Sequence, residues 1–173
     1  MPQILTYPDI NALAWQELVE RSPYATWFQT REAYEFYASV SAEFFPFAIG
    51  VGEDGHLAGV IVGYTTQEKN PIKQYFTCRS IIIGGPLLDE HISNDALSAL
   101  LLAAKRVTKG AIYVETRNFN DYSNWKEIFA GCGFDYIPHL NFHIDTSSLE
   151  LAQSNIGKHR WKYIRLSIRD GAT

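Results

Sequence analysis

Hydrophobic and polar residues follow two different spacings along this chain, and the change between them predicts a mixed α/β fold. Residues 80–83 and 111–114 are short apolar runs rich in β-branched side chains, which is typical of strands buried on both faces. Between them, residues 94–109 carry leucines at helical spacing, and Ser93 is placed to cap that helix. Two buried strands joined by a helix should lie parallel, with a right-handed crossover. We therefore expect this strand–helix–strand unit at the centre of a sheet.

The flanking pattern predicts further elements on both sides of this unit. Before it we expect a strand at 3–7, a helix at 9–21, an extended or loop segment at 26–29, a helix at 31–41, a hairpin of strands at 44–51 and 57–64, and one more strand at 72–77. After it we expect a short helix at 123–130, a strand at 134–144 and a final helical region.

Two local signals refine this outline. Asp54 and Gly55 are expected to form the hairpin turn, and Gly59 is expected to mark a bulge or a close backbone approach. Because no further linker or repeat is evident, we expect one α/β domain at 1–147 and a helical extension at 148–173.

Composition narrows the class of protein. The chain has 173 residues, of which 46% are hydrophobic and 20% charged, as in an ordinary globular domain. No apolar run approaches the length of a membrane span, and the N-terminus lacks a signal-peptide pattern. Cys78 and Cys132 are too few for a disulfide framework, and they are expected to be buried small hydrophobes. We therefore expect a cytoplasmic protein.

Charge is unevenly distributed. The net charge is −4, yet residues 158–173 contain five Lys or Arg and a single Asp, so this segment is basic and the rest of the chain is acidic. Lys158, Lys162, Arg165 and Arg169 would form one stripe on a helix, beside an apolar stripe of Trp161, Ile164 and Ile168. The functional interpretation is a site for the phosphates of a nucleotide or of RNA. The alternative is a solvated helix face or an interdomain contact.

The central unit offers two weaker candidates. Gly84 and Gly85 lie between a buried strand and a helix, where glycine lets backbone amides approach a phosphate, but a tight turn is the simpler interpretation. Glu115 and Arg117 alternate along the second strand, so they share a face. Glu115 would serve as a general base if desolvated, and the alternative is a structural ion pair.

The sequence does not identify a catalytic nucleophile or a metal site. His139 and His143 lie on one side of the predicted strand at 134–144, but no third ligand at suitable spacing accompanies them. We therefore expect no metal.

Several stretches resemble, in order, the motifs of FemAB-like proteins, which belong to the acetyltransferase-type (GNAT) superfamily. These stretches are residues 25–30 before the second helix, 83–87 at the glycine turn, 110–118 in the second central strand, 133–134, 141–145 and 158–165. The resemblance implies a GNAT-like domain, of the kind found in acyl-CoA N-acyltransferases, with a mixed sheet.

It also implies a function in bacterial cell-wall (peptidoglycan) synthesis. FemAB-like proteins are transferases that carry an amino acid from aminoacyl-tRNA to a peptidoglycan precursor, and they usually contain two GNAT-like domains. This chain resembles the first half, so the resemblance implies a missing second domain, a role in positioning substrate rather than in transfer alone, and no cofactor. Tyr37 lies about where some relatives carry a substrate-binding lysine.

Two alternatives remain open from the residues. The chain could be a free-standing N-acyltransferase that uses acyl-CoA, which the parallel strands and the glycine turn favour. It could instead be a non-catalytic interaction module that binds a partner through the apolar stripe of its last helix.

Overall fold

The computed structural model describes residues 1–40, 44–66, 70, 72, 76–141, 143 and 145–172. The chain divides into two compact units, Met1–Ile137 and Pro138–Thr173. The domain boundary expected from the sequence lies further along the chain and stays a prediction. The two units are described separately.

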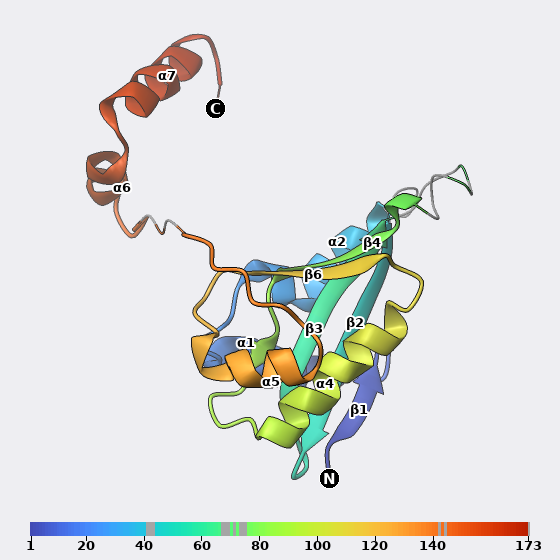
Figure 1. Ribbon diagram of the computed structural model, residues 1–173. Helices are drawn as coiled ribbons and strands as arrows, with labels where there is room; N and C mark the ends of the chain where they lie inside the picture. The colour runs from blue at the N-terminus through green and yellow to red at the C-terminus, as the bar shows by residue number, and fades with distance from the viewer. Residues whose placement is uncertain are drawn as a thin grey trace. The chain divides into compact units, whose positions relative to one another are not determined.

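The first unit is built on a mixed sheet (Figure 1). Its path is β1 (Gln3–Thr6), β2 (Phe44–Glu53), β3 (His56–Thr66), β4 (Arg79–Gly84) and β6 (Tyr113–Asn118), and the two-residue β5 (Leu87–Leu88) also pairs with β3. All neighbours are antiparallel except β4 and β6, which are parallel. The mixed α/β class and the parallel pairing of β4 with β6 are therefore confirmed. The expectation that this pair lies at the centre of the sheet is wrong, because β6 is the last strand of the described path and so forms an edge.

The hairpin between β2 and β3 forms as the sequence indicates. Asp54 and Gly55 have φ values of 49° and 84°, which are the left-handed conformations that a tight hairpin turn requires. The register shifts between Val51 and Gly52, opposite Gly59, so the expected bulge is present. A Cβ at Gly59 would meet Leu100 Cδ2 at 3.0 Å, which shows that a helix approaches the strand closely there.

Helices cover both faces of this sheet. On one face α4 (Asn94–Val107) and α5 (Lys126–Gly131) enclose a core that includes Ile61, Ile82 and Leu100. On the other face α1 (Ala12–Arg21) and α2 (Arg31–Ser39) enclose a second core that includes Trp15 and Val62. The sheet is therefore packed on both faces, and it holds the ends of its strands in fixed positions.

The starts of the helices follow from their caps. Ser93 Oγ accepts the Ala96 N–H at 3.1 Å and so begins α4, as expected. Asn11 Oδ1 accepts the N–H groups of both Leu13 and Ala14, so α1 begins at Ala12, later than the expected start at residue 9.

Two predicted elements are corrected by the structure, and a third lies largely outside the described residues. The segment expected to be loop at 26–29 contains a short 3-10 helix, η1 (Trp27–Gln29), in which Gln29 Oε1 accepts the Thr26 N–H at 2.7 Å. The expected helix at 123–130 is a 3-10 turn, η2 (Ser123–Trp125), followed by α5. The strand expected at 72–77 lies largely outside the described residues.

The strand expected at 134–144 does not form in its described residues, which have no regular secondary structure. Pro138 lacks an N–H and so cannot complete a strand ladder. In addition, Phe134 and Tyr136 lie beneath Lys105 Nζ and Lys126 Nζ, at 5.9 Å and 5.5 Å from the ring centres. These contacts hold the start of the segment against α4 and α5 instead.

The described residues of the second unit form two helices, α6 (Leu149–Asn155) and α7 (Lys158–Arg169). Ser148 caps α6 by accepting the Leu151 N–H at 3.2 Å. The expected helical region is therefore confirmed. The described helices of the chain are each too short or too polar to traverse a bilayer.

Candidate functional site at the ends of two parallel strands

The site lies where the two parallel strands of the first unit end together. Gly84 of β4 and Asn118 of β6 are register partners at the carboxyl ends of these strands. In open α/β sheets, ligands bind outside the carboxyl ends of strands at the point where the topology changes. The neighbourhood of Gly84 and Asn118 is therefore a candidate ligand-binding site.

The glycine pair at 84–85 makes a turn that other residues could not make. Gly84 and Gly85 have φ values of 87° and 83°. A Cβ on Gly84 would lie 2.6 Å from Thr26 Oγ1, and one on Gly85 would lie 2.6 Å from Asn118 Oδ1. Beyond the turn the chain resumes pairing with β3 as β5, whereas β6 has ended. The two parallel strands part at this turn.

Two buried side chains of the protein itself occupy the turn. Gln29 Nε2 donates to the carbonyl oxygens of Gly84 and Gly85, at 3.2 Å and 2.9 Å, and the Tyr122 hydroxyl donates to the Pro86 oxygen at 2.7 Å. Gln29 is 0% exposed and Tyr122 is 2% exposed. Burial raises the pKa of Tyr122 far above its ordinary value, so it stays a neutral donor.

The start of the crossover helix is also occupied. The Glu53 carboxylate accepts from both the backbone N–H and the hydroxyl of Ser93. The hydrogen bond from the Ser93 hydroxyl lowers the pKa of Glu53 below its ordinary value. A carboxylate thus already complements the positive end of the α4 dipole. The phosphate interpretation of Gly84 and Gly85 stays a prediction, and it gains no support from this arrangement.

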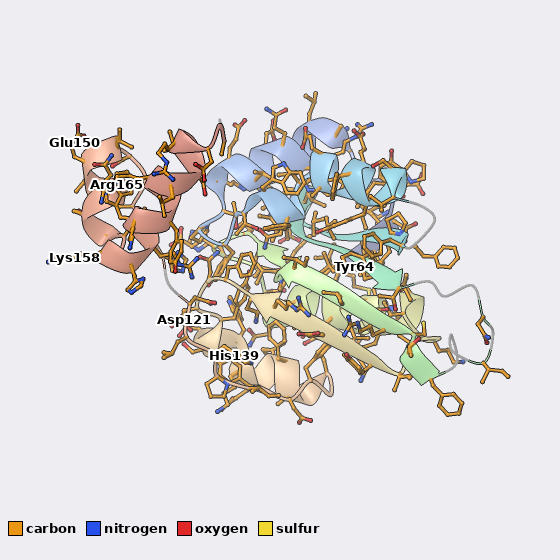
Figure 2. The ribbon with its side chains drawn as sticks, turned by 90° about the horizontal axis from the view of Figure 1, so that it is seen from above. Tyr64, Asp121, His139, Glu150, Lys158 and Arg165 are labelled. Atoms are coloured by element: carbon orange, nitrogen blue, oxygen red, sulfur yellow. The ribbon has the colours of Figure 1, made fainter. Side chains whose placement is uncertain are left out.

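The more open surface is the face of β4 and β6 on the α2 side. The strand period and the register place Arg79, Ile81 and Ile83 of β4 beside Tyr113, Glu115 and Arg117 of β6 on that face. Tyr64 of β3, which pairs with Ile81, continues the same row and is labelled in Figure 2. We call these seven residues the polar floor.

Charged groups dominate the polar floor. Arg117 donates to the Glu115 carboxylate through Nε at 2.9 Å and through Nη2 at 3.3 Å. This hydrogen bond from Arg117 to Glu115 raises the pKa of the Arg117 guanidinium. The ion pair that the sequence offered as the alternative to a general base is therefore present.

Arg79 is the second cation of the floor, and the sequence analysis missed it. Arg79 Nη1 lies 3.4 Å from the Tyr113 hydroxyl, and that contact raises the pKa of Arg79, whereas the nearby charge of Arg117 lowers it. The sequence signal that could have identified Arg79 is its spacing of two and four residues from Ile81 and Ile83, which places all three on one face of the strand.

Tyr37 reaches this neighbourhood from α2. Its side chain is 4% exposed, and its ring centre lies 4.9 Å from that of Tyr64. Within the described residues its hydroxyl has no hydrogen-bond partner. Burial, assisted by Tyr64, raises the pKa of Tyr37 to about 12. A buried hydroxyl of this kind is ready to receive a polar atom of a ligand or a water molecule.

Other candidates lie elsewhere. Lys158, Lys162, Arg165 and Arg169 all lie exposed on α7 in the second unit, and Figure 2 labels Lys158 and Arg165. The relation of this stripe to the polar floor is not defined, so its role stays a prediction.

The cysteines and the side chains that could bind a metal form no further centre in the part of the chain that the structure describes. Cys78 and Cys132 are buried and free, as expected. Within the described ranges, no three His, Cys, Asp or Glu side chains gather in a way that could hold a metal ion.

Comparisons with known proteins identify the fold. No protein-family model matches the sequence, and no curated protein matches it significantly. Among solved structures, FemX is similar with 19% identity and a TM-score of 0.58, over 77% of this chain and 32% of FemX. The chain therefore spans about a third of FemX.

Two acetyltransferases are similar over nearly their whole length. One is AAC(6')-Iy in complex with the bisubstrate analogue CoA-S-monomethyl-acetylneamine, with 12% identity and a TM-score of 0.56 over 83% of this chain and 97% of that one. The other is an acetyltransferase of Trypanosoma brucei, with 11% identity and a TM-score of 0.54 over 84% and 99%. At these identities the likeness shows the fold alone, which is GNAT-like.

Proposed function

We propose that this chain is a GNAT-like domain that positions a peptidoglycan precursor for a FemAB-like aminoacyl transfer and does not carry out the transfer alone. The observation that carries the proposal is that the turn at Gly84 and Gly85 is filled by side chains of the protein, whereas the polar floor is open. Gln29 and Tyr122 fill the turn at the carboxyl end of β4, the end of the strands at which α/β proteins commonly bind ligands. The polar floor beside it presents cations instead.

The chemistry required of such a domain is binding. In aminoacyl transfer, the amine of the precursor attacks the ester carbonyl of aminoacyl-tRNA. A C–N bond forms, the ester C–O bond breaks, the tRNA hydroxyl leaves and the amine loses a proton. Holding the two reactants in place supplies much of the acceleration of such a reaction. Arg79 and Arg117 suit this role because guanidinium groups bind phosphates and carboxylates through paired hydrogen bonds.

Glu115 is poorly placed as a general base. Its carboxylate accepts one hydrogen bond from Arg117 on each of its two oxygens, so an incoming proton would have to compete with the guanidinium. The described floor therefore supports positioning rather than proton abstraction. We assign the aminoacyl-tRNA and a second GNAT-like domain as partners of the reaction, and the cations of α7 as a further contact for one of these anionic ligands.

Calorimetry tests the proposal directly. The chain should bind a muramyl-peptide precursor in its nucleotide-linked or lipid-linked form, and it should not bind acetyl-CoA. It should show no aminoacyl transfer alone, and activity should appear when it is joined to a second GNAT-like domain. Absence of binding to both precursor forms would contradict the proposal.

A second function is favoured by one specific observation. The matched acetyltransferases are covered over 97% and 99% of their length, so a unit of this size makes a whole enzyme in those cases. A free-standing acyl-CoA-dependent N-acyltransferase is therefore the competing proposal. Micromolar binding of acetyl-CoA, with acetylation of an amine, would favour it over the first.

A further inference from the structure

A cavity of about 370 Å³ lies between the helices α1 and α2. We call it the interhelical pocket. Its lining includes Trp15, Gln16 and Val19 of α1 and Arg31, Glu32 and Glu35 of α2. The seven residues of the polar floor are not part of this lining in the described structure. The pocket is therefore a second concave site, apart from the one already described.

The lining changes from apolar at its base to charged at its mouth. Trp15 is 1% exposed and Val19 is half-buried, so they form the base. Arg31 and Glu35 come from the first two turns of α2, and their side chains are 46% and 54% exposed. A pocket with an apolar base and a few polar groups at its edge is the usual form of a small-molecule site.

The walls of the interhelical pocket are held by hydrogen bonds. The indole Nε1 of Trp15 donates to the Gln29 backbone oxygen at 2.9 Å. Thr30 Oγ1 accepts the Ala33 N–H at 3.2 Å and donates to the Trp27 oxygen at 2.9 Å, which fixes the start of α2. The pocket is thus formed before any ligand arrives, which reduces the entropy lost on binding.

Arg31 gives the pocket a site for an anionic group. Its Nε donates to Glu35 Oε1 at 2.9 Å, and this hydrogen bond raises the pKa of the Arg31 guanidinium. A guanidinium has five N–H donors, so Arg31 can bind a carboxylate oxygen and keep Glu35. The first N–H groups of α2 lie at the same place, and they have no acceptor within the helix.

Glu32 and Glu35 give the same pocket a site for a cationic group. Within the described residues Glu32 forms no ion pair, and Glu35 is paired with Arg31 through one of its oxygens. Two carboxylates disfavour a ligand that is only anionic, and the guanidinium disfavours one that is only cationic. A ligand with both charges satisfies both sets of groups.

We propose that the interhelical pocket binds a small zwitterion, with its carboxylate on Arg31 and its ammonium group between Glu32 and Glu35. Free α-amino acids and short peptides with free ends share this chemistry, and both are small enough for a cavity of this size. This inference goes beyond the proposed function because the pocket is separate from the polar floor. A free amino acid bound there would leave the polar floor available to its own ligand.

Nuclear magnetic resonance titration of the intact chain tests the inference. Alanine and the dipeptide alanyl-alanine are the probes, and at least one should bind at about 1–10 mM, since so small a ligand has few atoms with which to gain affinity. Its amide shifts should concentrate in α1 and the first turns of α2. N-acetylalanine and alaninamide, which each lack one of the two charges, should bind roughly fivefold to fiftyfold more weakly than alanine.

The two kinds of ligand are told apart by the same titrations. Tighter binding of alanine than of alanyl-alanine supports the proposal with a free amino acid as the ligand. Tighter binding of the dipeptide supports it with the ends of a short peptide as the ligand.

Substitutions at the mouth of the pocket test the assigned contacts. Arg31→Gln and Glu32→Gln should each weaken binding of the better probe by roughly fivefold to fiftyfold. Arg31→Lys, which keeps the positive charge, should retain more affinity than Arg31→Gln. Glu17→Gln is the matched control, because Glu17 is exposed on α1 outside the pocket lining and its loss should leave affinity unchanged.

The remaining outcomes would overturn the inference. Absence of binding by both probes up to roughly 10 mM would do so, as would equal affinity for alanine and its two blocked forms. Full affinity in folded Arg31→Gln and Glu32→Gln would do so too, and native spectra of these variants show whether they fold. Binding of a muramyl-peptide precursor with no binding of either probe would overturn this inference and leave the proposed function intact.

Discussion

Gln29 and Tyr122 meet at the same backbone oxygen, that of Gly84, although they lie far apart in the sequence: Gln29 Nε2 donates to it at 3.2 Å, and the Tyr122 hydroxyl, which donates to the Pro86 oxygen at 2.7 Å, lies 3.3 Å from it. One belongs to the segment before α2 and the other to the segment after β6. Their shared acceptor ties both segments to the turn at which β4 and β6 part.

Gln29→Leu should therefore destabilise the protein by about 2–4 kcal/mol. The change leaves the Thr26 N–H and the Gly85 oxygen buried without their partner. Urea unfolding followed by circular dichroism measures the loss. Gln16→Leu on the exposed side of α1 is the control and should change the free energy of unfolding by less than about 0.5 kcal/mol. Equal effects of the two substitutions would contradict the assigned role of Gln29.

Gly85→Ala should cost roughly 1–3 kcal/mol of unfolding free energy. The residue has a positive φ of 83°, and the new Cβ would lie 2.6 Å from Asn118 Oδ1. Gly131→Ala is a matched control because nothing lies within 4 Å of its Cβ position and it belongs to α5. That control should be neutral or stabilising by up to about 1 kcal/mol. A thermally stable Gly85→Ala variant would show that the turn is not constrained.

Glu53 should make the protein sensitive to acid. Its pKa is lowered in the folded state by the hydrogen bond from the Ser93 hydroxyl. The carboxylate therefore contributes stability above its ordinary pKa, about 4.3, and that contribution is lost as pH falls through the folded-state pKa. Urea midpoints measured between about pH 6 and pH 3 should fall less steeply in Glu53→Gln than in the native protein. Equal dependence of the urea midpoint on pH in the native protein and in Glu53→Gln would contradict the lowered pKa of Glu53.

Tyr37→Phe should leave the free energy of unfolding unchanged or raise it by up to about 1 kcal/mol at neutral pH, because the lost hydroxyl is buried without a partner among the described residues. Tyr122→Phe is the matched comparison and should cost about 1–2 kcal/mol, since that hydroxyl is hydrogen-bonded.

The raised pKa of Tyr37 also predicts how the stability of the protein changes at alkaline pH. The pKa of Tyr37 is raised to about 12, so the native protein should match its neutral-pH stability below the ordinary tyrosine pKa, and it should lose stability relative to Tyr37→Phe as pH rises through about 12. Tyrosinate absorbance should show fewer groups titrating late in Tyr37→Phe than in the native protein, in which burial also raises the pKa of Tyr122. If Tyr37→Phe also weakens precursor binding, the hydroxyl contacts the ligand.

Replacing Lys158, Lys162, Arg165 and Arg169 by Gln should weaken binding of an RNA minihelix that mimics a tRNA acceptor end. Each lost phosphate contact should make the dependence of log K on log salt shallower by about 0.7–0.9. Filter binding at several salt concentrations measures both quantities. Arg106→Gln with Lys109→Gln on the end of α4 is the control for general charge. Identical salt slopes in all variants would remove α7 from the proposed anion contacts.

The architecture was predictable where the relevant signal is local. The β-branched run before Gly84, the cap at Ser93 and the turn at Asp54 each act within a few residues, and each is present in the structure. The strand expected at 134–144 failed because alternation alone cannot reveal that Lys105 and Lys126 hold nearby rings elsewhere.

The site was predictable only in part. The Glu115–Arg117 pair follows from the strand period, and its formation is confirmed. Gln29 and Tyr122 could not be recognised because their partners lie 55 and 36 residues away. The roles of Tyr37, Gly84, Gly85 and the α7 stripe stay predictions.

The anchoring of η1 by Gln29 predicts the kinetics with which a ligand associates with this part of the protein. A surface that is already set when a ligand arrives requires no loop rearrangement after the encounter, so association should follow a single exponential at a rate proportional to ligand concentration. Stopped-flow tryptophan fluorescence should then show no plateau in the observed rate. Loosening the anchor with Gln29→Ala should introduce a slow, concentration-independent phase, because η1 would have to find its position beside the Gly84–Gly85 turn in each encounter.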